Sequence, residues 1–312
     1  MDDRAGLCYL RPMPRIRLTI AYDGTDFAGW QLQGRGERTV QGEVERAIAK
    51  IVAEHNGGQR IPLIAAGRTD SGVHALGQVA HFDAPDALAN IPWPIALNGR
   101  MRPDVRIVEA SLAHPRFHSQ YDALSKIYAY TIWTDRSHVN PLRRRFVWGM
   151  QQRLNLDAMD EAAALFLGTN DYNSFKNAGT PVGPRGTVRT VSRFWREPGQ
   201  TAPEITWRIQ ADGFLKQMVR NIMGCLVFVG VGKVTPQDVR SIIEQRDRNH
   251  LLPTAPPWGL CMERVFYPEA TDCGDQMAAT DHDGHQLAGG AEHQPDQHQP
   301  DQCRPGGDNA PE

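Results

Sequence analysis

Short stretches of the chain alternate between apolar and polar residues. In residues 15–22, RIRLTIAY, every second side chain from Ile16 to Tyr22 is apolar or aromatic, and this period of two predicts a half-buried strand. Further strands are predicted at residues 78–82, 105–110, 126–133, 187–195, 204–211 and 259–266. The predicted structure is therefore rich in strands.

Apolar residues three and four positions apart predict helices between these strands. The first runs over residues 40–53, where Thr39 can act as the N-cap. Three more helices are predicted at residues 157–167, 214–229 and 236–246. Gly168 is placed to end the helix at 157–167 as its C′ residue, and Pro236 suits the first turn of the last helix.

Strands and helices alternate along the chain, and most links between them are short or hairpin-like. This arrangement predicts an α+β fold with a mostly antiparallel sheet, built from two similar halves with flanking helices. The predicted organisation is an N-terminal extension at residues 1–13, one half at 14–145, a second half at 146–267 and a tail at 268–312. No clean linker marks the boundary between the halves, so they are expected to share one central sheet.

The composition is that of a globular protein without a membrane span. Hydrophobic residues make up 40% of the 312 residues, which is enough for a packed core, and no run of about twenty apolar residues is present. The N-terminus lacks the apolar segment of a secretory signal. The five cysteines are odd in number and widely scattered, which fits reduced thiols rather than a disulfide framework. We therefore expect a cytoplasmic protein.

The near-neutral total charge conceals an uneven distribution. The formal net charge is −2, but residues 268–312 hold ten acidic residues, one basic residue and no aromatic residue. The rest of the chain then holds 33 basic and 26 acidic residues. A basic body favours a polyanionic partner. The acidic tail is predicted to be disordered because it lacks the apolar surface that folding requires, and its histidines and cysteines match no structural zinc pattern.

The segment AAGRTDSGVHALGQVAHF, residues 65–82, carries the main candidate chemistry. Its glycines permit unusual backbone angles and the close approach of a ligand. Gly67 and Gly72 do not form a phosphate-binding loop, because no lysine follows them at the required position. Asp70 can act as a nucleophile or general base, or it can bond the amides of a structural turn. The residues alone leave both interpretations open.

A second segment, RFHSQYDALSKIYAY at residues 116–130, mixes cations with aromatic rings. Tyr128 and Tyr130 fall on the same face of the predicted strand, and Arg116, His118 and Lys126 lie nearby in the sequence. Rings beside cations suit base stacking and phosphate contact in a nucleic-acid-binding protein. Ordinary core tyrosines explain the same pattern equally well.

A third segment, GFLKQMVRNIMG at residues 213–224, is an apolar helix face interrupted by Arg220. Arginine is seldom buried without a partner, so a buried Arg220 requires an acidic group, for which Asp70 is the candidate. If Arg220 instead lies on the solvent face, no partner is needed.

Seven motifs occur in an order that resembles the TruA family, tRNA pseudouridine synthase A. They are AYDGTDFAGWQLQ (21–33), TVQGEVERAI (39–48), GRTDSGVHALGQVAHF (67–82), ALN (96–98), FHSQYDALSKIYAY (117–130), FLKQMVRNIMG (214–224) and TAPPWGL (254–260). The resemblance covers nearly all of residues 14–267, and GRTDSGVHA is a highly specific part of it. Ser71 stands where many members have alanine, and residues 177–186 and the acidic tail are less typical of the family.

The resemblance implies the pseudouridine synthase fold, with two α+β halves around a continuous sheet and a basic cleft between them. It implies that the protein isomerises uridine to pseudouridine, so that a C–C glycosidic bond replaces a C–N bond. The expected targets are positions 38, 39 and 40 in the anticodon arm of tRNA. The expected partners are tRNA and a second copy of the chain in a homodimer, with no DNA and no membrane. Neither a metal nor an organic cofactor is expected.

The same resemblance implies roles for five residues. Asp70 matches the catalytic aspartate, which attacks the ribose C1′ or deprotonates the sugar. Tyr128 matches the tyrosine that stacks on the flipped uracil, and Arg68 matches the residue that fills the space left by the base. Arg220 matches the arginine that pairs with the aspartate, and Leu260 is expected to wall the uracil pocket. Because the target base must first leave its stack, the enzyme also has to offset the free energy of extruding it.

Two other functions stay open at this point. The chain can be a non-catalytic RNA-binding protein that keeps the fold, or a nucleoside or sugar hydrolase that uses Asp70. Measuring pseudouridine formation by an Asp70→Asn variant separates an isomerase from a non-catalytic RNA-binding protein. Loss of product with tRNA binding retained would support the isomerase. Release of free uracil from uridine would favour the hydrolase.

Overall fold

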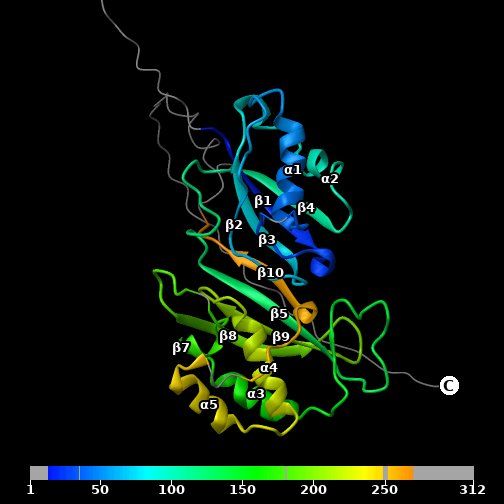
Figure 1. Ribbon diagram of the computed structural model, residues 1–312, viewed down its shortest axis with the longest axis vertical. Coiled ribbons are helices and arrows are strands. Elements are labelled where there is room, and N and C mark those ends of the chain that lie inside the picture. The colour runs from blue at the N-terminus through cyan, green and yellow to red at the C-terminus, as the bar shows by residue number, and fades with distance from the viewer. Residues whose placement is uncertain (1–12, 35, 180, 249–251, 270–312) are drawn as a thin grey trace, which may run out of the picture. The chain divides into compact units, whose positions relative to one another are not determined.

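The strands form one continuous sheet. The computed structural model describes residues 13–34, 36–179, 181–248 and 252–269. Within them the sheet has ten strands, and eight of these follow the order β4-β1-β3-β10-β5-β9-β8-β7 (Figure 1). The other two, β2 and β6, pair with β3 and β5 respectively. The bounds of the strands are β1 Arg15–Tyr22, β2 Ile64–Ala65, β3 His74–Asp83, β4 Val105–Ala113, β5 Ser125–Trp133, β6 Trp148–Gly149, β7 Gly168–Asp171, β8 Val188–Pro198, β9 Glu204–Ala211 and β10 Leu260–Phe266. Most pairs are antiparallel, and the exceptions are β10 with β3 and β5 with β6. The predicted α+β class with a mostly antiparallel sheet is confirmed.

The last described strand, β10, joins strands that are far apart in the sequence. It lies between β3 and β5, with Cys261 opposite His74 and Met262 opposite Tyr128. The sheet is therefore continuous across the predicted boundary at residues 145 and 146. The division of the chain into two halves stays a prediction.

In the described part of the chain, five α-helices pack on this sheet in two groups. They are α1 Val40–Val52, α2 Trp93–Asn98, α3 Leu156–Ala164, α4 Met218–Gly230 and α5 Pro236–Gln245. In Figure 1, α1 and α2 lie beside β1 and β4, whereas α3, α4 and α5 lie beside β7, β8 and β9. The Thr39 side chain accepts a hydrogen bond from the Gly42 amide, and Pro236 stands in the first turn of α5, so both predicted helix starts are confirmed.

Two predicted helix boundaries are wrong, one at the start of a helix and one at the end of another. The helix predicted at 214–229 begins at Met218, because Gln217 has a φ of 61°, in the left-handed region, where an α-helix cannot continue. The helix predicted at 157–167 ends at Ala164, because the amides of Leu165 and Phe166 bond carbonyls three residues back and tighten the chain out of the α-helix. Gly168 has a φ of +86° but begins β7 instead of following the helix directly.

The strand predicted at residues 78–82 is also longer than its pattern indicates. It begins at His74, because Ala75 pairs with Tyr22 on β1 and with Met262 on β10. Both partners come from other parts of the sequence, so the local pattern carries no sign of them.

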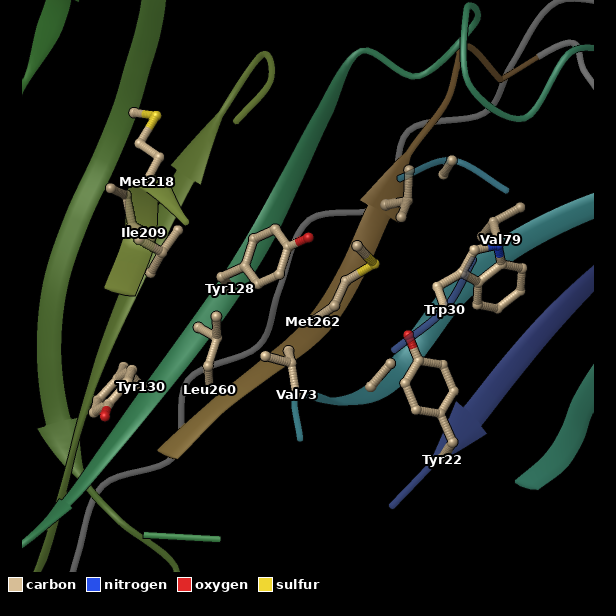
Figure 2. Packing of buried hydrophobic residues seen from close by; sticks show 14 of the residues in the cluster. Tyr22, Trp30, Val73, Val79, Tyr128, Tyr130, Ile209, Met218, Leu260 and Met262 are labelled. Atoms are coloured by element: carbon tan, nitrogen blue, oxygen red, sulfur yellow. The ribbon is translucent and has the colours of Figure 1, made fainter. Parts of the chain in front are cut away.

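The core is one continuous cluster of buried side chains. It extends from Ile16, Leu18 and Ile20 on β1 to the buried face of α4. Figure 2 shows its middle, where Tyr128 on β5 and Met262 on β10 lie on adjacent strands. The two helical groups therefore rest on a shared hydrophobic core.

Some predictions concern parts of the chain that lie outside the described residues. The predicted N-terminal extension falls there except for Met13, and so does the predicted acidic tail except for Pro268 and Glu269. Within the described ranges, no helix has the length and apolar content that crossing a bilayer requires.

We expect Met262→Ala to lower the free energy of unfolding by about 2–5 kcal/mol, because it empties a fully buried position on the strand between β3 and β5. Urea denaturation followed by circular dichroism measures the change. Leu142→Ala is the matched control, since Leu142 is 84% exposed and its truncation should change stability by less than about 0.5 kcal/mol. Equal losses in both variants would contradict the assignment of β10 to the core.

Candidate active site

Asp70 lies in the segment between β2 and β3, and neighbouring backbone holds this segment in place. The Trp30 amide donates to the Thr69 carbonyl at 3.1 Å, and the Ser71 hydroxyl donates to the Phe27 carbonyl at 3.0 Å. The hydroxyls of Tyr22 and Thr69 share a buried hydrogen bond of 2.8 Å. The residues on both sides of Asp70 are therefore fixed to the segment that follows β1.

Gly29 allows these two segments to approach closely. Its φ is +103°, a conformation that residues with side chains rarely adopt. A Cβ at this position would lie 2.8 Å from the Thr69 carbonyl oxygen and 3.2 Å from the Asp70 carbonyl carbon. Any side chain at position 29 would thus push the Asp70 segment away.

The carboxylate of Asp70 meets the guanidinium of Arg220, which comes from the first turn of α4. Arg220 Nη1 donates to Asp70 Oδ2 at 3.3 Å, and Arg220 Nε donates to the Ala255 carbonyl at 2.9 Å. The two charged side chains are 22% and 13% exposed. Within the part of the chain that the structure describes, Asp70 Oδ1 accepts no hydrogen bond. The expected contact between Asp70 and Arg220 is therefore present, and one carboxylate oxygen is left for another ligand.

Tyr128 stands on β5 beside this ion pair. It pairs with Met262 on one neighbouring strand and with Ile209 on the other (Figure 2). The Phe214 ring meets it edge-on, with 4.9 Å between the ring centroids. Burial raises the pKa of Tyr128 well above its usual value, and the nearby Tyr22 and Asp70 raise it further. The ring is thus a neutral aromatic surface near the carboxylate.

The other two predicted site residues lie around this group. Leu260 begins β10 opposite Tyr130, whose hydroxyl donates to the Pro256 carbonyl at 2.8 Å. Arg68 is exposed on the Asp70 segment, and its side chain forms no hydrogen bond or ion pair within the described residues. The structure therefore brings Asp70, Arg220 and Tyr128 together, with Leu260 on the strand next to Tyr128 and Arg68 exposed on the Asp70 segment.

Sequence reasoning missed several neighbours of this group. Tyr22 and Thr69 position the Asp70 segment through a bond between side chains 47 residues apart, and no local pattern signals such a pair. The sequence gives no reason to distinguish Lys126 from the other cations of residues 116–130. In the structure Lys126 approaches Gly67 at the start of the Asp70 segment.

Among the cavities in the described part of the chain are two, of about 400 and 550 Å³, that Asp70 does not line. The larger cavity is lined by Ala129 and Cys261 among other residues. Because successive side chains of a strand point to opposite faces, Ala129 lies on the face opposite to Tyr128, and the cavity opens on that face. In the described ranges, no three His, Cys, Asp or Glu side chains gather closely enough to hold a metal ion.

This arrangement suits covalent or acid–base chemistry at a sugar carbon. A single carboxylate is held by a guanidinium and keeps one oxygen available, next to an aromatic ring. Such a carboxylate can attack an electrophilic carbon or accept a proton, while the ring can stack on a planar base.

Comparison with known proteins places the chain among RNA-modifying enzymes. A family model described as tRNA pseudouridine synthase matches residues 18–122 and 162–268. The protein named tRNA pseudouridine synthase A from Maridesulfovibrio salexigens is 49% identical over 262 residues, which cover 84% of this chain and 93% of that protein. The protein of that name from Solidesulfovibrio magneticus is 50% identical, and the match covers 82% of this chain and 92% of that protein. The one from Bacillus subtilis is 41% identical, and the match covers 81% of this chain and 99% of that protein.

The matched ranges include the segments that carry Asp70, Arg220 and Leu260, whereas Tyr128 lies between the two ranges of the family model. The two matched ranges supply strands on both sides of β5 in the sheet. The position of Tyr128 next to Met262 on β10 therefore comes from strand pairing.

We expect Gly29→Ala to destabilise the protein by about 1–3 kcal/mol more than Gly58→Ala. Both glycines have positive φ, +103° and +79°, but only at Gly29 would a Cβ strike backbone, since nothing lies within 4 Å of a Cβ at Gly58. The difference between the two variants in urea denaturation isolates the contact with the Asp70 segment. Identical free energies of unfolding would contradict the close approach of the two segments.

Proposed function

Since the chain belongs to the tRNA pseudouridine synthase family, we propose that it converts uridine to pseudouridine at positions 38, 39 and 40 in the anticodon arm of tRNA, with Asp70 acting on the ribose of a flipped-out uridine. Family membership is shown by the match of the family model and by the curated relatives. The chain is accordingly an isomerase of the TruA type. The target positions and the roles of individual residues are the proposal.

The observation that carries the role of Asp70 is its contact with Arg220 beside the ring of Tyr128. In the isomerisation, the bond between uracil N1 and ribose C1′ breaks, uracil turns, and a bond between C5 and C1′ forms while C5 loses a proton and N1 gains one. Asp70 either adds to C1′ and leaves again, or removes a proton from the sugar and returns it. Both routes begin with an ionised carboxylate that has a free oxygen. Arg220 supplies the counter-charge and leaves Oδ1 open.

The remaining residues have roles in holding the extruded base. Tyr128 would stack on the uracil, whose turning within the site requires a smooth, neutral surface. Leu260 would close the pocket on the β10 side. Arg68, exposed and free of hydrogen bonds in the described part of the chain, would occupy the space that the base leaves in the RNA. Filling this space offsets part of the free energy of unstacking.

The overall charge of the chain supports a polyanionic substrate. Without residues 268–312, basic residues outnumber acidic ones by 33 to 26, so tRNA would be attracted before any specific contact forms. The homodimer and the cytoplasmic location follow from the family resemblance and the cysteine pattern, and both stay predictions. Analytical ultracentrifugation of the full chain tests the first.

We expect Asp70→Asn to lower kcat for pseudouridine formation by at least about 10³-fold while tRNA binds within about threefold of the wild-type affinity. Asparagine keeps the size of the side chain and one oxygen that accepts from Arg220, but it lacks the nucleophilic and basic oxygen. Tritium release from C5-labelled tRNA measures turnover, and filter binding measures affinity.

Asp86→Asn is the matched control, because Asp86 is an exposed carboxylate in a short 3₁₀ turn after β3, and its removal should change neither quantity. Undiminished turnover in Asp70→Asn would leave a binding protein or a different catalytic residue as the explanation. Release of free uracil, from uridine or from tRNA, would instead indicate a hydrolase.

A further inference from the structure

Three cationic side chains gather beside the proposed active site. Lys126 comes from β5, Arg189 from β8, and Arg185 from the segment before β8. Lys126 and Arg189 are on strands separated only by β9, and both Arg185 and Arg189 act electrostatically on Lys126. The three cations therefore form one cluster, which we call the Lys126 cluster.

Two glycines leave the Lys126 cluster open. A Cβ at Gly67 would lie 3.6 Å from Lys126 Nζ, and a Cβ at Gly213 would lie 3.3 Å from Arg189 Nε and 3.4 Å from Arg185 Nη1. Neither glycine has a side chain to cover these nitrogens. The donor groups therefore border on bare backbone, which is a common feature of sites that admit a ligand closely.

The cluster has more positive charge than the protein around it neutralises. Asp212 is its carboxylate; it bonds Arg185 at 3.0 Å and accepts from the Thr190 amide at 3.0 Å. Arg189 is only 9% exposed, and within the described residues its Nε finds no hydrogen-bond partner. In the same part of the chain, the Lys126 ammonium has neither a hydrogen bond nor an ion pair.

Burial of unpaired cations is unfavourable, and the titration of Lys126 reflects this. Burial, and after it the nearby Arg185 and Arg189, together lower the pKa of Lys126 to about 8, although Asp212 acts in the opposite direction. Burial likewise lowers the pKa of Arg189. An anion in contact with both groups would relieve this strain, because it supplies the missing charge and the missing acceptors.

The Lys126 cluster adjoins the residues proposed for the reaction. Lys126 precedes Tyr128 by two residues on β5, so both side chains point to the same face of the sheet. Gly67 precedes Asp70 by three residues in the same segment. A nucleotide whose uracil rests on Tyr128 and whose ribose meets Asp70 would therefore have a neighbouring phosphate within reach of Lys126.

We propose that Lys126, Arg185 and Arg189 bind one backbone phosphate of the tRNA strand next to the extruded uridine and so fix the position of its ribose against Asp70. This inference rests on the proposed function. A phosphodiester carries one negative charge and two free oxygens. Lys126 would contact it as a point charge, and the guanidiniums would donate N–H groups to the oxygens. Uncharged base edges and ribose hydroxyls could not balance the positive charge of the cluster.

Lys126→Met tests the proposal, because methionine retains the length of the side chain without its charge. We expect the Kd for tRNA at about 0.1 M salt to rise roughly tenfold and the slope of log Kd against log salt to fall by close to one, as for the loss of one phosphate contact. Stability in urea should stay unchanged or increase, because an unpaired and partly buried cation is removed. Lys50→Met, at the exposed end of α1, is the matched control and should alter none of these quantities.

The pH dependence provides a second measurement on the same variants. Between pH 7 and pH 8.5 the wild-type protein should lose about threefold in tRNA affinity, because Lys126 loses its proton above a pKa of about 8. Lys126→Met should lack this part of the decrease. Asp212→Asn should tighten tRNA binding, since it removes the negative charge beside Arg185 and keeps the acceptor for the Thr190 amide.

A methylphosphonate substitution identifies the phosphate. A tRNA is assembled with one uncharged methylphosphonate at each position flanking the target uridine in turn. One of these should weaken binding to wild-type protein roughly tenfold and have no further effect on Lys126→Met, which is the coupling that a direct contact requires. Independent losses at every position would overturn the inference, and so would an unchanged salt slope. If wild-type protein forms no pseudouridine at all, the proposed function is wrong. The phosphate contact is tested independently of that result, because its measurements are of tRNA binding.

Discussion

The contact between Asp70 and Arg220 is the interaction on which the arrangement of the site depends. It joins two side chains 150 positions apart, one on the segment before β3 and one in the first turn of α4. Both groups are mostly shielded from water, so either would be unfavourable without the other. The pair therefore couples the packing of the Asp70 segment to that of α4. Because a single oxygen of Asp70 accepts from Arg220, the contact holds the carboxylate without occupying it.

Sheet order determines what surrounds this pair. β10 lies between β3 and β5, and it therefore places Met262 against Tyr128 and Leu260 against Tyr130. Antiparallel partners point to the same face, so all four side chains line the sheet on the side that bears the buried core (Figure 2). Residues from the middle of the chain and from its last described strand thus meet on one surface. The opposite face holds the larger cavity, which separates any ligand there from the chemistry at Asp70.

Features encoded by neighbouring residues were predictable from the sequence. The strict alternation of β1 and the Thr39 cap of α1 gave both elements to within a residue. The Asp70–Arg220 contact followed from a general rule, that a buried charge needs a counter-charge. The long-range features were not predictable: the first residues of β3 depend on pairing with β10, and the surroundings of Lys126 depend on β9 separating β5 from β8. Strand order brings these groups together, and local patterns do not record it.

The first turn of α4 conflicts with local helix preferences, and this conflict fits a site rather than a scaffold. Gln217, directly before the helix, has a left-handed φ of 61° without being glycine, which costs about 1 kcal/mol or more. Arg220 adds a cation to the first turn, where the helix dipole favours anions, and that turn contains no acidic residue. The buried face of α4, with Ile222 and Leu226 fully enclosed, supplies the stability that its first turn lacks. The helix starts sharply at Met218, and Arg220 in its first turn reaches Asp70. The unfavourable backbone geometry is therefore found at the place where it positions the counter-charge of the proposed catalytic group.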